Sequence, residues 1–195
     1  MKSAPDVVVP DLLTLLARFQ GVRADTLALV TGLTEEDCCV QAMPDCSPTK
    51  WHLAHTSLFF ETFIVEKFSL SGQFQPFHPS FKILFNSYYQ GVGEQFKRAR
   101  RGLLTRPSLD QVLLYRAHVE AQVQLLGQRI QSGGNLTFQR EFAALLELGM
   151  QHEQQHQELI LTDIKYLFSC NPLLPAWRDA TVAVDATAAA RPRQR

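Results

Sequence analysis

The sequence predicts an all-α protein, a bundle of four long helices joined by polar turns and by one long irregular connection. Apolar residues recur at helical spacing through most of the chain, and only weak strand candidates lie between these segments. The chain has 195 residues and is 46% hydrophobic, which is enough to fill the core of one domain. Long amphipathic helices with few strands bury their apolar faces by packing on one another.

The first two helices are expected over residues 10–31 and from the SPTKWHLAHT segment to about Phe68. The first has a stripe of Leu, Phe and Val residues at helical spacing. At the start of the second, Ser47 is placed to cap the helix, and Pro48 fits the first turn because its missing N–H is harmless there.

The third and fourth helices have clearer boundaries. The third starts after Pro107 at SLDQ, which has capping-box spacing, and stops at SGGN, where two glycines favour a turn. The fourth runs from about Thr137 to Phe168 without a proline, and the Asn-Pro pair that follows ends it.

Residues 69–106 form the long connection between the second and third helices. Connections of this length are usually functional or contain short helices of their own. The last twenty residues are rich in Ala and Arg and show no periodic core pattern. We therefore expect a helical bundle over residues 1–175 and a linker or disordered tail over residues 176–195.

Composition argues against several classes of protein. Nineteen basic and nineteen acidic side chains cancel, so no general attraction to nucleic acid or to an anionic membrane is expected. No run of 18 apolar residues is present, and Asp6 and Asp11 interrupt the apolar start, which argues against a membrane span and a secretory signal. The four cysteines form no CxxC pair, and adjacent Cys38 and Cys39 are poor partners for a disulfide. We interpret them as reduced thiols of a cytoplasmic protein.

Histidines stand out in two of the predicted helices. The fourth contains HEQQH, with His152 and His156 one turn apart, and the second contains WHLAHT, with His52 and His55 three residues apart. Residues at these spacings share a helix face, and bundles build metal sites from facing side chains. Histidines four apart also occur by chance on a wet face. Imidazoles on two inward faces favour a shared ion, because a buried unpaired polar group costs about 1–3 kcal/mol.

The residues alone leave the nature of this site open. Spacing does not separate His52 from His55 as the ligand from the second helix, and imidazoles suit Zn, Fe, Ni or Cu. The HExxH pattern also fits the zinc helix of metalloproteases, with Glu153 as general base, but the third ligand and the strand context of that class are not evident. Three protein ligands would leave positions for water, dioxygen or substrate, as in a catalytic site.

Other polar side chains carry weaker expectations. Glu158 and Asp163 follow His156 on the fourth helix and are candidates to accept hydrogen bonds from histidine rings. Tyr88 and Tyr89 are candidates to line the cavity, although aromatic residues near the mouth of a bundle more often serve packing.

Several blocks of the sequence resemble one enzyme family. WHLAHT with FFETF, then HPSFKILFNSYYQGVG, RRGLLTRPSLDQVLLYRAHV and LELGMQHEQQHQELILTDIKY are similar, in this order, to blocks of one known domain. This is the N-terminal DinB-like domain of the ergothioneine-biosynthesis sulfoxide synthases, the EgtB family. The similarity covers roughly residues 10–175 and implies a DinB-like four-helix bundle.

The resemblance implies a mononuclear non-haem Fe(II) cofactor. The matching ligand positions are His55, His152 and His156. His52 occupies a position at which the family accepts other residues, so we expect it to support a ligand or to have a structural role. Iron held in this way can bind a thiolate, an imidazole and dioxygen in one coordination sphere. The three reactants are then held next to one another and need not meet in solution.

The resemblance also implies the substrates. The family uses O2 to join a thiol sulfur to the imidazole carbon of hercynine (trimethylhistidine) and oxidises that sulfur to a sulfoxide. Gln155 matches a position that contacts the hercynine imidazole, and Arg98 and Arg101 match arginines that hold the carboxylates of a cysteine-containing thiol. Guanidinium groups suit this role because they pair bidentately with carboxylates. Without the family, a solvated basic loop is the simpler interpretation of KRARR.

The sequence departs from the family in one respect. The sulfoxide synthases have a C-terminal domain like the formylglycine-generating enzymes, which supplies a catalytic tyrosine, and no such domain follows NPLLPAWRD. We therefore expect a chain that is incomplete as a synthase by itself, or that meets a C-terminal domain in trans. The alternative is a stand-alone DinB-like bundle that acts as a thiol-dependent metal transferase or as a non-catalytic metal-binding module.

Overall fold

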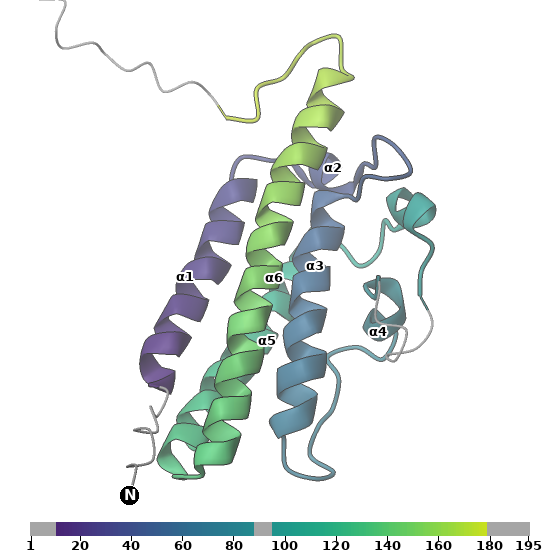
Figure 1. The fold of residues 1–195 in the computed structure, drawn as a ribbon. Helices are drawn as coiled ribbons and strands as arrows, with labels where there is room; N and C mark the ends of the chain where they lie inside the picture. The colour runs from purple at the N-terminus through teal and green to yellow at the C-terminus, as the bar shows by residue number, and fades with distance from the viewer. Residues whose placement is uncertain (1–10, 88–94, 179–195) are drawn as a thin grey trace, which may run out of the picture.

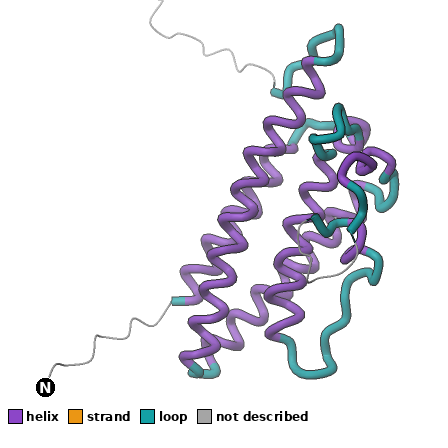
Figure 2. Tube along the Cα trace, turned by 45° about the vertical axis from the view of Figure 1, so that its right-hand side comes forward, coloured by secondary structure: helices purple, strands orange, loops and turns teal. Residues whose placement is uncertain are grey.

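The computed structural model describes residues 11–87 and 95–178, and within these ranges it contains helices and loops but no strands (Figure 2). Four long segments pack side by side (Figure 1): α1 (Leu12–Val30), α3 (Thr49–Phe60), α5 (Leu109–Ser132) and α6 (Leu136–Ser169). α3 continues into a π-helical turn, η1 (Glu61–Glu66). The described parts of the connections contain the short helices α2 (Glu35–Cys39) and α4 (Phe81–Leu84) and the 3-10 helix η3 (Arg98–Leu103). The predicted all-α four-helix bundle is confirmed for the residues that the structure describes.

The capping residues that the sequence offers set most helix boundaries. At the start of α5, the Ser108 hydroxyl accepts a hydrogen bond from the backbone N–H of Gln111, and the Gln111 side chain accepts one from Ser108 N–H. This is the predicted capping box, and it satisfies two backbone donors that have no partner inside the helix. α6 starts after Asn135, whose side chain accepts from two backbone N–H groups.

The start of α3 differs from the prediction by one residue. Pro48, and not Ser47, is the N-cap, and the Pro48 carbonyl accepts from the N–H groups of Trp51 and His52. The Ser47 hydroxyl instead accepts a hydrogen bond from the Arg101 guanidinium at 2.7 Å. The residue predicted as a cap also lines a cavity beside α3 and α6.

Every residue of α3 is buried. The helix packs against α5 and α6, and the connection that contains α4 covers its remaining side (Figure 1). Gly149 on α6 permits the close approach of α6 to α3, because a Cβ atom at this position would lie 2.3 Å from the ring of Phe60 and 2.9 Å from that of Phe59. The two histidine-bearing helices are thus in direct contact.

The long connection is anchored to the bundle by hydrogen bonds. Buried Glu61 accepts from the backbone N–H of Phe77 at 2.8 Å and from the Tyr115 hydroxyl at 2.7 Å. The Trp51 indole donates to the carbonyl of Leu84 at 3.2 Å. These contacts hold the segment that precedes residues 88–94, and with it Phe85, against η1 and α3.

The ends of the described chain add two further facts. Trp177, in the segment predicted as a tail, donates its indole N–H to the carbonyl of Leu29 at 3.0 Å, so contacts with the bundle reach at least this residue. None of the four cysteines, all of which the structure describes, takes part in a disulfide. Among the helices described here, none has the length and apolarity needed to cross a membrane.

Candidate metal centre

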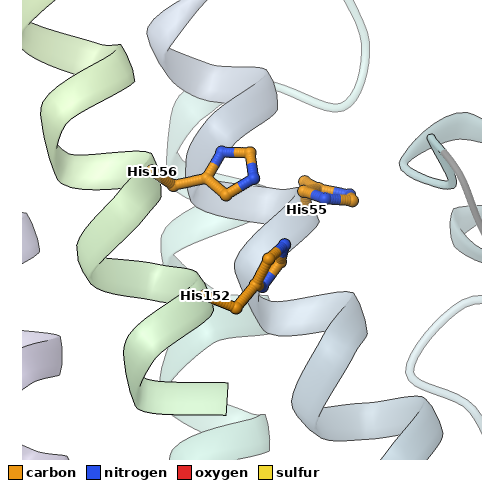
Figure 3. Close-up of side chains that lie close together, drawn as sticks. All are labelled: His55, His152 and His156. Carbon is orange, nitrogen blue, oxygen red and sulfur yellow. The ribbon is translucent and has the colours of Figure 1, made fainter. Parts of the chain in front are cut away.

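Three histidines from two helices converge beside the centre of the bundle. His55 projects from α3, and His152 and His156 project from α6 (Figure 3). One ring nitrogen of each lies within 4.8 Å of the other two, and the ring centroids are 4.7–5.1 Å apart. A metal–imidazole bond is about 2.0–2.1 Å long, so small side-chain rotations would bring all three nitrogens within reach of one ion. The structure therefore brings together the three residues that the resemblance implies as ligands.

His55 is held by its surroundings on two sides. Its Nδ1 lies 2.6 Å from the carbonyl oxygen of Phe85, which can only accept, so Nδ1 carries the hydrogen and the lone pair is on Nε2. The ring also stacks on Trp51, with centroids 4.5 Å apart and an interplanar angle of 14°. A hydrogen bond from the second ring nitrogen to a carbonyl is the usual way in which proteins orient a histidine ligand.

Burial keeps the three imidazoles neutral. It lowers the pKa of His55 to about 3, with a further contribution from His152, and it lowers the pKa of His152 to about 4. The pKa of His156 is also far below its usual value, first because of burial and then because other histidines surround it. Nδ1 of His152 is buried and has no hydrogen-bond partner among the described residues. Neutral imidazole is the form that binds metals, so the donor set fits a divalent transition-metal ion.

A fourth histidine, His52, contacts His156 on the side away from His55 and His152. The residue is 2% exposed, and its Nδ1 lies 2.8 Å from Nδ1 of His156. Its Nε2 lies 3.1 Å from a carboxylate oxygen of Asp163. Both nitrogens of His52 are thus engaged by protein partners, and the histidines whose ring nitrogens lie close together are His55, His152 and His156.

The three histidines open onto a cavity of about 430 Å³. Its wall also includes Arg98, Arg101 and Gln155, the residues that the resemblance implies for substrate binding. All six predicted site residues, which come from α3, η3 and α6, therefore meet at one cavity.

The two predicted arginines have different environments. Arg101 is buried; its guanidinium lies 3.4 Å from the centroid of the Trp51 ring and donates to the hydroxyls of Ser47 and Ser87 at 2.7 and 3.0 Å. Arg98 is exposed at the cavity rim and donates to the carbonyl of Asp45. The simpler interpretation of a solvated basic loop therefore does not hold for Arg101.

Comparison with known proteins agrees with this architecture. A family model described as the DinB superfamily matches residues 18–160, which is more than half of the chain. The chain belongs to the DinB superfamily. A comparison with curated proteins finds no match. The part of the DinB domain that matches includes His55, His152 and His156, so the cluster lies within the family's domain.

A second polar cluster of the DinB domain was not predicted from the sequence. Glu153, which follows His152, is completely buried, and its two carboxylate oxygens contact Arg23 at 3.0 Å and Arg116 at 2.8 Å. The Thr26 hydroxyl donates to it at 2.8 Å. Because its oxygens are already paired with two guanidinium groups, Glu153 is not placed as the general base of a zinc-protease helix.

The remaining candidates divide clearly. Asp163 contacts a histidine ring as expected, although that ring is His52 and not one of the three converging histidines. Glu158 is exposed on the surface of α6. Tyr88 and Tyr89 lie outside the described residues.

Proposed function

We propose that this DinB domain binds one Fe(II) ion through His55, His152 and His156 and serves as the metal-binding part of a sulfoxide synthase that joins a cysteine-type thiol to hercynine. The observation that supports the proposal most is the meeting of three neutral imidazoles, two arginines and one glutamine at a single cavity. Three imidazoles alone would suit many metal proteins. Guanidinium groups beside them suit a substrate that carries carboxylates.

Each residue of the cavity has a role in this proposal. Fe(II), when bound, would supply the O2-dependent oxidation chemistry that forming a carbon–sulfur bond from a thiol requires. Arg98 and Arg101 bind the carboxylates of the thiol substrate, and Gln155 donates or accepts a hydrogen bond at the imidazole of hercynine. The Trp51 ring stacks on His55 and covers one face of that imidazole, and the guanidinium of Arg101 packs on the Trp51 ring.

The metal part of the proposal is tested by anaerobic loading with Fe(II). We expect about one equivalent of iron per chain in the wild type and loss of stoichiometric iron in His152→Ala and His156→Ala, measured after gel filtration. His118→Ala, which removes an exposed histidine of α5, is the matched control and should keep its iron. Full iron content in His152→Ala and His156→Ala would contradict the assignment.

The substrate part is tested with two neighbouring arginines. Arg98 lines the cavity, whereas Arg100 is exposed two residues later and does not. In the Co(II)-loaded protein, the thiolate-to-metal absorption band should report cysteine binding. Arg98→Ala should weaken this binding about 10- to 100-fold, the usual effect of losing a charge-assisted hydrogen bond, and Arg100→Ala should not change it.

The same titration separates the runner-up function. A stand-alone metal-binding bundle, such as a thiol-dependent metal transferase, needs the histidines but not a carboxylate site. A thiol without a carboxylate, such as 2-mercaptoethanol, should bind the wild type and Arg98→Ala equally under our proposal. If cysteine also binds both proteins equally, the arginines do not recognise substrate and the runner-up is favoured.

A further inference from the structure

His52 and Asp163 form a chain of contacts that ends on a candidate metal ligand. Nδ1 of His52 lies 2.8 Å from Nδ1 of His156, and Nε2 of His52 lies 3.1 Å from Oδ2 of Asp163. The resemblance implies for His52 only a structural or supporting role, and the sequence placed Asp163 only as a candidate partner of some histidine ring. The geometry specifies which ring nitrogen carries each hydrogen.

The hydrogen positions follow from counting donors and acceptors along this chain. A carboxylate can only accept, so Nε2 of His52 donates to Asp163. A neutral imidazole has one N–H, which leaves Nδ1 of His52 as an acceptor. The 2.8 Å contact between the two Nδ1 atoms needs one hydrogen, and this hydrogen must belong to His156. His156 therefore carries its hydrogen on Nδ1 and its lone pair on Nε2.

The lone pair of His156 then lies on the side of the other two rings. Figure 3 shows one nitrogen of the His156 ring directed toward His55 and His152, and the other directed away from them. Nδ1 is the nitrogen engaged by His52, so Nε2 is the nitrogen that faces the cluster. In the opposite tautomer, a hydrogen on Nε2 would occupy the position that a metal needs.

We propose that His52 and Asp163 are positioning residues that hold His156 in the Nδ1–H tautomer and so present its Nε2 lone pair to the metal. This inference rests on the proposed metal site, but its first consequence concerns the metal-free protein. His55 obtains the same tautomer from the carbonyl of Phe85 at 2.6 Å. The tautomers of two of the three candidate ligands are thus fixed before a metal binds. A backbone carbonyl fixes that of His55, and the side chains of His52 and Asp163 fix that of His156.

Asp163 is itself fixed by a contact from outside α6. The same oxygen, Oδ2, accepts from the backbone N–H of Ser47 at 2.8 Å. The Ser47 hydroxyl accepts from Arg101 at 2.7 Å, so one residue joins the orienting chain to the guanidinium in the cavity wall. Because Ser47 directly precedes the N-cap of α3, the carboxylate is tied to the helix that carries His52 and His55.

The direct test is the tautomer of His156 in the apo protein, read from long-range ¹H–¹⁵N correlation spectra of histidine-labelled samples. The wild type should show the Nδ1–H form. His52→Phe keeps a ring but offers no acceptor, and it should lose that form. Asp163→Ala lets either nitrogen of His52 carry the hydrogen and should give a mixture. An Nε2–H tautomer of His156 in the wild type would overturn the proposal.

The second readout is the affinity for Co(II), measured by titration of its visible absorption. His52→Phe should bind Co(II) about 10- to 100-fold more weakly, as is usual when a partner of a metal ligand is removed. His52→Asn places an amide oxygen near the former Nδ1 and should recover most of the affinity. His118→Phe is the matched control, and far-UV circular dichroism confirms folding of each variant.

The outcomes of the two readouts are distinct. Unchanged Co(II) affinity in His52→Phe would overturn the positioning role, even if the metal site is real. A wild-type protein that binds no Co(II) but shows the Nδ1–H tautomer, lost in His52→Phe, would overturn the proposed metal function and leave the control of the tautomer standing.

Discussion

Two buried polar clusters meet α6 at adjacent residues, and they compensate for burial in different ways. In the ion-pair cluster, Glu153 contacts Arg23, Arg116 and Thr26, so a buried carboxylate is matched by opposite charges. In the histidine cluster, beside the cavity, burial is tolerated because the imidazoles stay neutral. One cluster uses opposite charge, and the other avoids charge.

The difference separates a structural role from a functional one. The carboxylate of Glu153 accepts hydrogen bonds on both oxygens from three protein donors. In the histidine cluster, Phe85 and His52 accept hydrogen bonds from the Nδ1–H groups of His55 and His156, which places the lone pair of each ring on Nε2. Buried polar groups that satisfy each other's hydrogen bonds stabilise the fold. Buried groups whose lone pairs are directed toward a common point indicate a site for a cation.

The largest expected difference between the clusters is their response to pH. The pKa values of His55 and His152, about 3 and about 4 in the folded protein, lie below the value of about 6.5 in an unfolded chain. Below pH 6.5 the unfolded chain therefore binds protons that the folded apo protein does not. As the pH is lowered below 6.5, the free energy of unfolding should therefore decrease by about 1.4 kcal/mol per pH unit for each histidine, until the pH reaches the pKa of that histidine in the folded protein.

Urea denaturation of the metal-free protein between pH 7.5 and 4.5 measures this slope. His152→Gln, which cannot titrate, should reduce it by the contribution of one proton. Glu153 should add to the slope only near the acid end of this window. Burial raises its pKa, but Arg23 and Arg116 outweigh burial and hold the pKa below its usual value, so only the unfolded chain takes up this proton as the pH approaches 4.5. A flat profile above pH 4.5 would show that the imidazoles are not protected from protonation by the fold.

The second prediction breaks the ion-pair cluster. Glu153→Gln removes the buried carboxylate that pairs with Arg23 and Arg116 and leaves Arg23 with the more distant Glu120 at 3.8 Å. It should lower the free energy of unfolding by about 3–5 kcal/mol. Glu147→Gln on the same helix is the matched control, because Glu147 pairs with Arg18 at 2.9 Å on the surface and should contribute less than about 1 kcal/mol. Similar losses in both variants, measured by urea denaturation at pH 7.5, would contradict the role given to burial.

The four long helices could be predicted from the sequence because their signals are local. Capping residues and glycines mark the ends of α5, and apolar spacing marks its length. The pair at His152 and His156 was visible for the same reason, since one turn of helix fixes their relative position. The metal-binding hypothesis therefore needed no tertiary information to be raised.

The residues that were missed depend on contacts between distant segments. Every residue of α3 is buried, so spacing had no exposed face from which to distinguish His52 from His55. The acceptor for His55 is a backbone carbonyl of Phe85, and no side-chain pattern reports a carbonyl. Glu153 was unexpected in the core because its partner Arg23 lies 130 residues away. Only the packing of α1, α5 and α6 brings these charges together.

The smallest predicted effect concerns Gly149, which lies about one turn before both clusters on α6. An alanine Cβ here would press on the rings of Phe60 and Phe59 at 2.3 and 2.9 Å, so either the rings or α6 must move. Gly149→Ala should lower the free energy of unfolding by about 1–3 kcal/mol, the usual cost of overpacking a core. It should also weaken Co(II) binding, because His152 and His156 move away from His55 together with α6.

Gly21→Ala provides the opposite case. Gly21 is exposed within α1, and a Cβ there meets no atom within 4 Å. Alanine is favoured over glycine inside a helix by about 1 kcal/mol, so this variant should be slightly more stable and should bind Co(II) as the wild type does. If Gly149→Ala lost stability but kept its Co(II) affinity, the distance between α3 and α6 would not control the histidine cluster. The close packing at Gly149 would then matter for the stability of the fold and not for metal binding.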